Sequence, residues 1–136
     1  MEKGKRQITT TRHFEIFKRE AELWIGRLGL TDWRIDFKHK NSPDGIGARA
    51  WFGAKVGDRI AEVGLAVDWD PDVITVHRVR ETAFHEVFEI MLCPLGWIGD
   101  CRYAREEEIP EAKHVIIRRF ENLFYGNRKE RLFQKV

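Results

Sequence analysis

The stretch "AFHEVFEIML", residues 83–92, places three ionisable side chains inside an otherwise apolar segment. When successive residues are set about 100° apart around a helix, the apolar side chains of this segment cover most of the circumference. A helix with so wide an apolar surface belongs in the core of a domain. The remaining sector holds the polar side chains, which are Arg78, Thr82, His85, Glu86, Glu89 and Cys93. We therefore predict a buried helix, from about residue 73 to residue 93, that carries one polar stripe.

The polar stripe predicts a metal site. His85 and Glu89 are one helical turn apart, so their side chains project side by side, and a carboxylate in a core helix is costly unless a cation meets it. An imidazole and a carboxylate at this spacing can bind one divalent ion, and Glu86 can reach a water on that ion. The pattern H-E-x-x-E is thus a variant of the zinc motif H-E-x-x-H with a harder second ligand. The competing interpretation is a surface stripe, in which His85 and Glu89 form a helix pair worth only about 0.5 kcal/mol.

A catalytic zinc site takes a third protein ligand, which here must come from another element. The last predicted helix, "PEAKHVIIRRFENLFYG" (residues 110–126), carries a polar strip beside its apolar face. His114 in this strip is the natural candidate, and Glu111 and Glu121 are the alternatives. Arg118, one turn after His114, is placed to stabilise an oxyanion or to hold the carboxylate of a ligand. The competing interpretation of the strip is an exposed helix face with salt bridges.

The segments before the stripe indicate the fold class. Residues 10–30 have helical spacing, with Thr10 or Thr11 as the cap and Gly29 as the end. The stretch "DWRIDFKHK" (residues 32–40) alternates as a half-buried strand does. The stretch "ARAWFGAKVGDRIAEVGLAVDW" (residues 48–69) is typical of a hairpin with its turn near residues 56–59. The order of helix, three strands, helix, loop and helix predicts an α+β domain with a three-stranded antiparallel sheet.

The composition fits one domain of ordinary size. The chain has 136 residues, of which 43% are hydrophobic and 34% charged, and its net charge is +2. We predict a flexible basic tail over residues 1–10, a single domain over residues 11–126 and a basic tail over residues 127–136. No apolar run approaches the about 20 residues of a membrane span, and no signal peptide is recognisable, so we expect a cytoplasmic protein with no membrane partner. The spacing of Cys93 and Cys101 fits neither a disulfide in that compartment nor a zinc finger.

The order of the segments resembles a known enzyme family. The stretch "WRIDF" (residues 33–37), a glycine-containing loop, the strand "IAEVGLAVDW" (residues 60–69) and "ETAFHEVFEIML" (residues 81–92) resemble the SprT-like minimal zincin metallopeptidases. Small phage-encoded proteins of the metallopeptidase class are more similar still. The resemblance implies a minimal zincin-like fold, with His85 and position 89 as metal ligands, Glu86 as the general base and His114 as the third ligand. The chain departs from the usual H-E-x-x-H at Glu89.

The activity that this resemblance implies is hydrolysis of a peptide or protein substrate with zinc, or another divalent metal, as the cofactor. In the family the substrate lies along the edge of the sheet, and we expect that edge to be the strand ending at Leu65–Val67. One rival hypothesis is a catalytically degenerate zincin-fold binding protein, in which the metal joins two helices. A second rival is a small nucleic-acid-binding module that uses the basic tails, Arg118, Arg119 and either Trp51 or Trp97.

Overall fold

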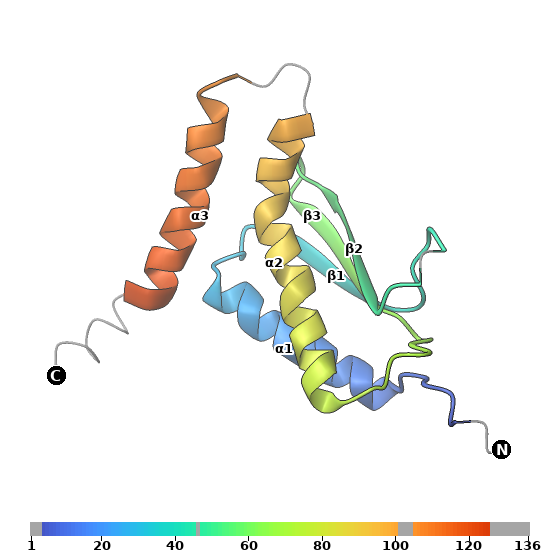
Figure 1. Ribbon diagram of the computed structural model, residues 1–136. Helices are drawn as coiled ribbons and strands as arrows, with labels where there is room; N and C mark the ends of the chain where they lie inside the picture. The colour runs from blue at the N-terminus through green and yellow to red at the C-terminus, as the bar shows by residue number, and fades with distance from the viewer. Residues whose placement is uncertain (1–3, 46, 101–104, 126–136) are drawn as a thin grey trace, which may run out of the picture.

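The computed structural model describes residues 4–45, 47–100 and 105–125. Its elements are α1 (Thr11–Arg27), β1 (Arg34–His39), β2 (Ala50–Lys55), β3 (Ile60–Leu65), α2 (Val76–Asp100) and α3 (Glu108–Tyr125). Helix α2 runs between the sheet on one side and α3 on the other (Figure 1). Helix α1 crosses the amino-terminal half of α2. The α+β class and the order of elements are confirmed. Among the described residues, no helix is both long and apolar enough to span a membrane.

The sheet is mixed, so the prediction of an antiparallel sheet is wrong in one pairing. β2 and β3 form the predicted antiparallel hairpin, but β1 pairs with β3 in parallel, and the strand order is β1-β3-β2. The ten residues 40–49 between β1 and β2 carry the chain past β3 to its far side. β3 is therefore the central strand, and the substrate edge that we placed on the strand ending at Leu65–Val67 is wrong. The outer strands of this sheet are β1 and β2.

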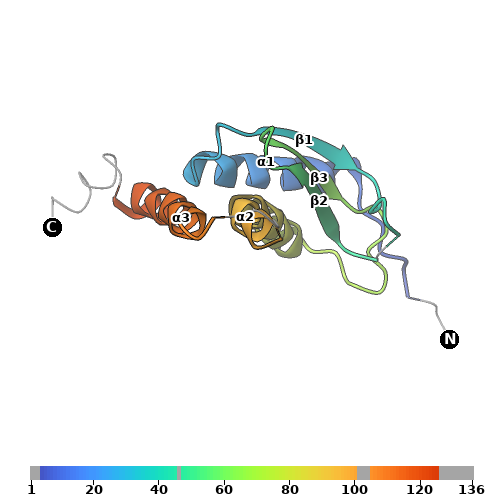
Figure 2. The same ribbon diagram turned by 90° about the horizontal axis from the view of Figure 1, so that it is seen from above.

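The core lies where α1 and α2 meet one face of β3. Figure 2 shows these layers from above, with α3 outside them on the far side of α2. Alternate residues of β3 point toward the two helices, as expected for a strand with one covered face. On these three elements the most deeply buried core side chains are Phe17 and Ala21 of α1, Ala61, Val63 and Leu65 of β3, and Val79, Ala83, Val87 and Ile90 of α2.

Helix α1 begins and ends where its sequence predicts. Thr10 is the N-cap, since its hydroxyl accepts from the His13 backbone N–H while the His13 ring accepts from the Thr10 backbone N–H. Gly29 follows the last turn with a φ of 68°, a conformation that glycine adopts without strain. The N–H of Leu30 then donates to the carbonyl of Ile25 at 2.9 Å and closes the helix.

The amino-terminal segment is joined to the domain, although we predicted a flexible tail over residues 1–10. The N–H of Thr9 donates to the carbonyl of Val67 at 2.8 Å, and the N–H of Trp69 donates to the carbonyl of Gln7 at 2.9 Å. The Arg6 guanidinium also lies 2.7 Å from the Asp68 carboxylate. The predicted tail at residues 127–136 lies outside the described residues.

Helix α2 starts later and ends later than predicted. It begins at Val76 and continues through Pro94 to Asp100, whereas we placed its end at Cys93. Proline removes one hydrogen bond from a helix interior, but Leu95 and Ile98 beyond it are half-buried, and this burial favours continuing the helix. α3 begins at Glu108, so Pro110 still lies in the first turn, where its missing N–H is tolerated.

Gly64 gives a direct test of the β2–β3 pairing. A Cβ built on Gly64 would overlap the indole ring of Trp51, its partner in the register, while a Cβ on Gly53 would meet nothing within 4 Å. The Trp51 ring is also held in place, since its Nε1 donates to the carbonyl of Lys40 at 3.0 Å. We expect Gly64→Ala to lower the free energy of unfolding by about 2–3 kcal/mol, because an overpacked ring must move.

The matched control is Gly53→Ala on the neighbouring strand. It should change the free energy of unfolding by less than about 0.5 kcal/mol, as substitutions at open surface positions do. Urea denaturation of both variants measures the difference. Equal stability of the two variants would show that Trp51 does not cover Gly64.

Candidate active site on helix α2

The polar stripe of α2 carries the pair that the sequence predicts. The His85 Nε2 and Glu89 Oε1 atoms lie 3.6 Å apart across one turn of the helix. Both side chains reach solvent, with 68% of the His85 side chain and 46% of the Glu89 side chain exposed. At the end of the stripe, burial raises the pKa of the Cys93 thiol to about 11, so this thiol stays protonated at neutral pH.

Glu86 differs from its neighbours on the stripe because it is buried. Only 7% of the residue is exposed, and burial raises the pKa of its carboxyl to about 6. The charge of His85 lowers this pKa and the charge of Glu89 raises it, but both effects are smaller than that of burial. In the described part of the chain, no hydrogen bond or ion pair reaches the Glu86 carboxyl. It is thus a desolvated carboxyl with hydrogen-bonding capacity to spare.

Two shallow hollows meet at His85 and Glu86. The first, of about 350 Å³, lies between α2 and residues 47–50, and the second, of about 300 Å³, extends along the start of β2. Glu89 lines the second hollow, and so do Asp44 and the small side chain of Ala50. The stripe therefore faces the loop before β2 and the first residues of that strand.

The His85–Glu89 pair fits part of a metal site. Two donor atoms on one tetrahedral zinc ion, each about 2.1 Å from it, are about 3.4 Å apart. The 3.6 Å between Nε2 and Oε1 is close to that separation, and one nitrogen with one carboxylate oxygen is a donor set that zinc accepts. Within residues 4–45, 47–100 and 105–125, no group of three or more His, Cys, Asp and Glu side chains is placed to hold an ion.

Helix α3 does not bring its candidate ligands to this pair. It packs against α2 through Phe120, whose ring centroid is 5.9 Å from that of Phe88. Phe88 lies about 60° from His85 and about 100° from Glu89 around the helix, on the side of His85 that faces away from Glu86, so α3 approaches the opposite border of the stripe. The four predicted residues of α3 are all exposed, and they are Glu111, His114, Arg118 and Glu121.

Arg119 of α3, for which the sequence predicts no structural role, reaches the end of α1. The Arg119 guanidinium donates to the carbonyl of Leu28 at 3.2 Å, to that of Gly29, and to Asp32 at 3.5 Å. These contacts join α3 to the end of α1. Nothing in the local sequence distinguishes Arg119 from Arg118, since the contact partners are about ninety residues away.

The other histidines are engaged in contacts away from the stripe. The Thr9 hydroxyl donates to the carbonyl of Ala66 at 2.7 Å, so it accepts from His39 Nε2, which is 2.8 Å away. His39 also stacks on Phe14, and burial lowers its pKa. His77 forms an exposed pair with Glu81 at 3.4 Å.

Comparison with protein-family models, with curated proteins and with solved structures finds no match to this chain. The function is therefore inferred from the chain's own residues.

The raised pKa of Glu86 predicts a gain in stability when this carboxyl is replaced. Its folded pKa of about 6 exceeds the ordinary value of 4.5, so ionisation above pH 6 opposes folding and protonation below pH 4.5 removes that effect. In protein treated with a chelator, Glu86→Gln should raise the free energy of unfolding at pH 7 by about 1 kcal/mol. Urea denaturation at pH 7 and pH 4.5 measures this, and the gain should disappear at the lower pH. A gain of the same size at both values would assign it to packing instead.

Proposed function

We propose that this chain is a metal-dependent hydrolase that cleaves peptide bonds, with its active centre on α2. His85 and Glu89 would hold the ion, and Glu86 would transfer the proton. The observation that carries the proposal is the Glu86 carboxyl, which is nine-tenths buried, has no hydrogen-bond or ion-pair partner among the described residues and lines the same hollow as the histidine–carboxylate pair. Such a carboxyl destabilises a core helix. Groups with a perturbed pKa of this kind are concentrated at functional sites, and this supports a chemical role for Glu86.

The chemistry assigned to Glu86 is proton transfer at its carboxylate oxygens. An ion between His85 and Glu89 would supply Lewis acidity, which polarises a peptide carbonyl. Glu86 would accept one proton from the attacking water as the oxygen of that water bonds to the carbonyl carbon. It would then give the proton to the amide nitrogen as the C–N bond breaks. A carboxyl with a pKa of about 6 is mostly ionised at neutral pH, and it is therefore able to begin as the base.

The outer edge of β2 is the proposed position for the substrate backbone. β2 is hydrogen-bonded to β3 on one side only, and its first residues line the hollow that contains His85, Glu86 and Glu89. An extended peptide can add to such an edge through main-chain hydrogen bonds. Gly53 and Ala54 are small and exposed, so they would leave room for its side chains.

The nucleic-acid hypothesis is weaker because two of its residues are occupied. Trp51 is 9% exposed, covers Gly64 and donates its Nε1 to a backbone carbonyl, so it offers no face on which a base could stack. Arg119 is engaged by Leu28, Gly29 and Asp32. We therefore carry the hydrolase forward as the proposed function.

Metal content and cleavage, measured on the same variants, test this proposal. We expect zinc-loaded protein to hold about one ion per chain, and His85→Ala or Glu89→Ala to lose it. Glu86→Gln should keep the ion and lose about 100-fold or more of the peptidase rate, the usual scale for removing a general base. His77→Ala is the matched control, because His77 and Glu81 form the same kind of pair on the same helix without a buried carboxyl beside them. Undiminished cleavage by Glu86→Gln would refute the assigned base.

His114→Ala tests the ligand that the sequence assigns to α3. His114 is exposed on a helix that approaches a different flank of α2, so we expect this variant to retain its zinc. Elemental analysis after gel filtration decides the point. Loss of the ion would contradict this expectation and would support the three-ligand set of His85, Glu89 and His114.

A further inference from the structure

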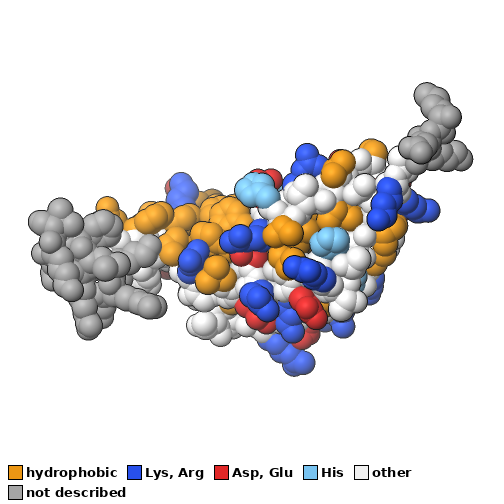
Figure 3. Space-filling view, turned by 90° about the horizontal axis from the view of Figure 1, so that it is seen from below, with side chains coloured by type: hydrophobic (Ala, Val, Ile, Leu, Met, Phe, Trp, Pro, Cys, Tyr) orange, Lys and Arg blue, Asp and Glu red, His pale blue; other side chains and the backbone are white. Residues whose placement is uncertain are grey.

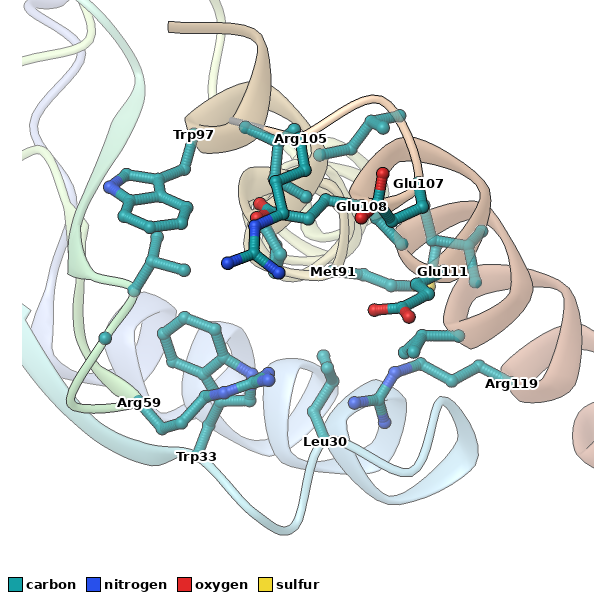
Figure 4. Close-up of a pocket in the computed structure, with 18 residues that line it drawn as sticks. Leu30, Trp33, Arg59, Met91, Trp97, Arg105, Glu107, Glu108, Glu111 and Arg119 are labelled. Carbon is teal, nitrogen blue, oxygen red and sulfur yellow. The ribbon is translucent and has the colours of Figure 1, made fainter. Parts of the chain in front are cut away.

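A larger cleft, separate from the hollow at His85, lies between α2, α3 and the β2–β3 turn (Figure 4). Its volume is about 630 Å³, within the range of about 300–1,000 Å³ that is typical of small-molecule sites. Leu30 and Trp33 form one wall, Met91, Leu95 and Trp97 of α2 a second, and the first half of α3 a third. None of the His85, Glu86 and Glu89 side chains lines this cleft.

One side of the cleft is apolar but contains an unsatisfied donor. Leu30, Trp33 and Met91 are 1%, 6% and 3% exposed, so they form a firm and already desolvated surface. The indole Nε1 of Trp33 is buried and has no hydrogen-bond partner. Buried polar groups are nearly always hydrogen-bonded, so an orphan donor at a cleft suggests that a ligand supplies the acceptor.

Two arginine side chains with spare donors face the same region. The Arg59 guanidinium lies over the Trp33 ring, 5.5 Å from its centroid, and its ion pair with Asp32 is long, at 3.6 Å. Arg105 projects into the cleft from the opposite side (Figure 4), and no hydrogen bond or ion pair joins its guanidinium to another described residue. Arg119, by contrast, is engaged by the end of α1.

The acidic residues of the cleft limit the charge that it can accept. Glu107, Glu108 and Glu111 lie toward α3, while Trp33 and Arg59 lie on the far side of the opening (Figure 4). Two guanidinium groups and one indole N–H can hold a single anionic head group. The second charge of a dianion such as a phosphate monoester would increase both its attraction to the two guanidinium groups and its repulsion by the three carboxylates, so with three carboxylates against two guanidinium groups it would gain no net attraction.

We infer that this cleft binds an apolar carboxylate of small size, with its chain against Met91, Leu95 and Trp97. Its carboxylate would lie between Arg59 and Arg105 and accept from the Trp33 indole N–H. The inference does not depend on hydrolysis at Glu86, because it uses a different set of residues on a different side of α2.

Calorimetric titration of the full chain with sodium octanoate tests the inference. We expect saturable binding at one site, and about tenfold weaker binding for octan-1-ol, which has the same chain without the charge. Octyl phosphate at pH 8 should also bind less tightly than octanoate. Absence of saturable octanoate binding, or equal affinity for octanoate and octan-1-ol, would overturn the inference, and tighter binding of octyl phosphate would overturn the choice of a carboxylate.

Variants identify the residues involved. Arg59→Gln and Arg105→Gln should each weaken octanoate binding by about tenfold, the scale of one charge-assisted contact. Trp33→Phe keeps most of the ring and removes the N–H, so it should weaken octanoate more than octan-1-ol. Arg19→Gln, an exposed position on α1, is the control and should bind as the parent does. Unchanged affinity for octanoate in both Arg59→Gln and Arg105→Gln would contradict the proposed head-group site. Peptidase activity, measured separately, tests the role of Glu86 and not the cleft.

Discussion

The enclosure of α2 between α1 and the sheet is the constraint on which the rest of the structure depends. Four side chains of α2, at Val79, Ala83, Val87 and Ile90, are fully buried. A helix so held cannot turn about its axis without exposing several of them, and burying each of the three larger side chains is worth about 1.5–3 kcal/mol. Core packing therefore fixes the direction of every other side chain on the helix.

The position of Glu86 follows from this fixed orientation. Glu86 lies at the border between the buried surface and the polar stripe, so its carboxyl is desolvated while His85 and Glu89 remain in solvent. The free energy gained by packing the apolar side chains of α2 greatly exceeds the electrostatic cost of this desolvation. Natural proteins commonly retain destabilising groups of this kind where function requires them. The sheet and α3 pack on different sides of the helix that this packing holds in place. The hollow at Glu86 and the cleft at Trp33 are therefore separate.

Features encoded by nearby residues were predictable from the sequence, and features that depend on distant contacts were not. The α2 stripe, the β2–β3 hairpin and the cap at Thr10 all follow from spacings of a few residues. The alternation in β1 is the same whether its partner runs parallel or antiparallel, so its pairing with β3 could not be deduced. Likewise, the apolar face of α3 is visible in the sequence, but the flank of α2 that it meets depends on contacts between distant residues, such as those of Arg119 with the end of α1 and of Phe120 with Phe88. The side-by-side placement of His85 and Glu89 was therefore predictable, and the location of His114 was not.

The segment before α1 has a consequence for how the domain can be shortened. Thr9 links the carbonyl of Ala66 to the ring of His39, and its backbone pairs with Val67. A chain trimmed to begin at the first residue of α1 would keep every named helix and strand. It would nevertheless leave a half-buried imidazole and two main-chain acceptors without their hydrogen bonds. A shortened chain that keeps these contacts therefore has to begin at or before Gln7, whose carbonyl accepts from the N–H of Trp69.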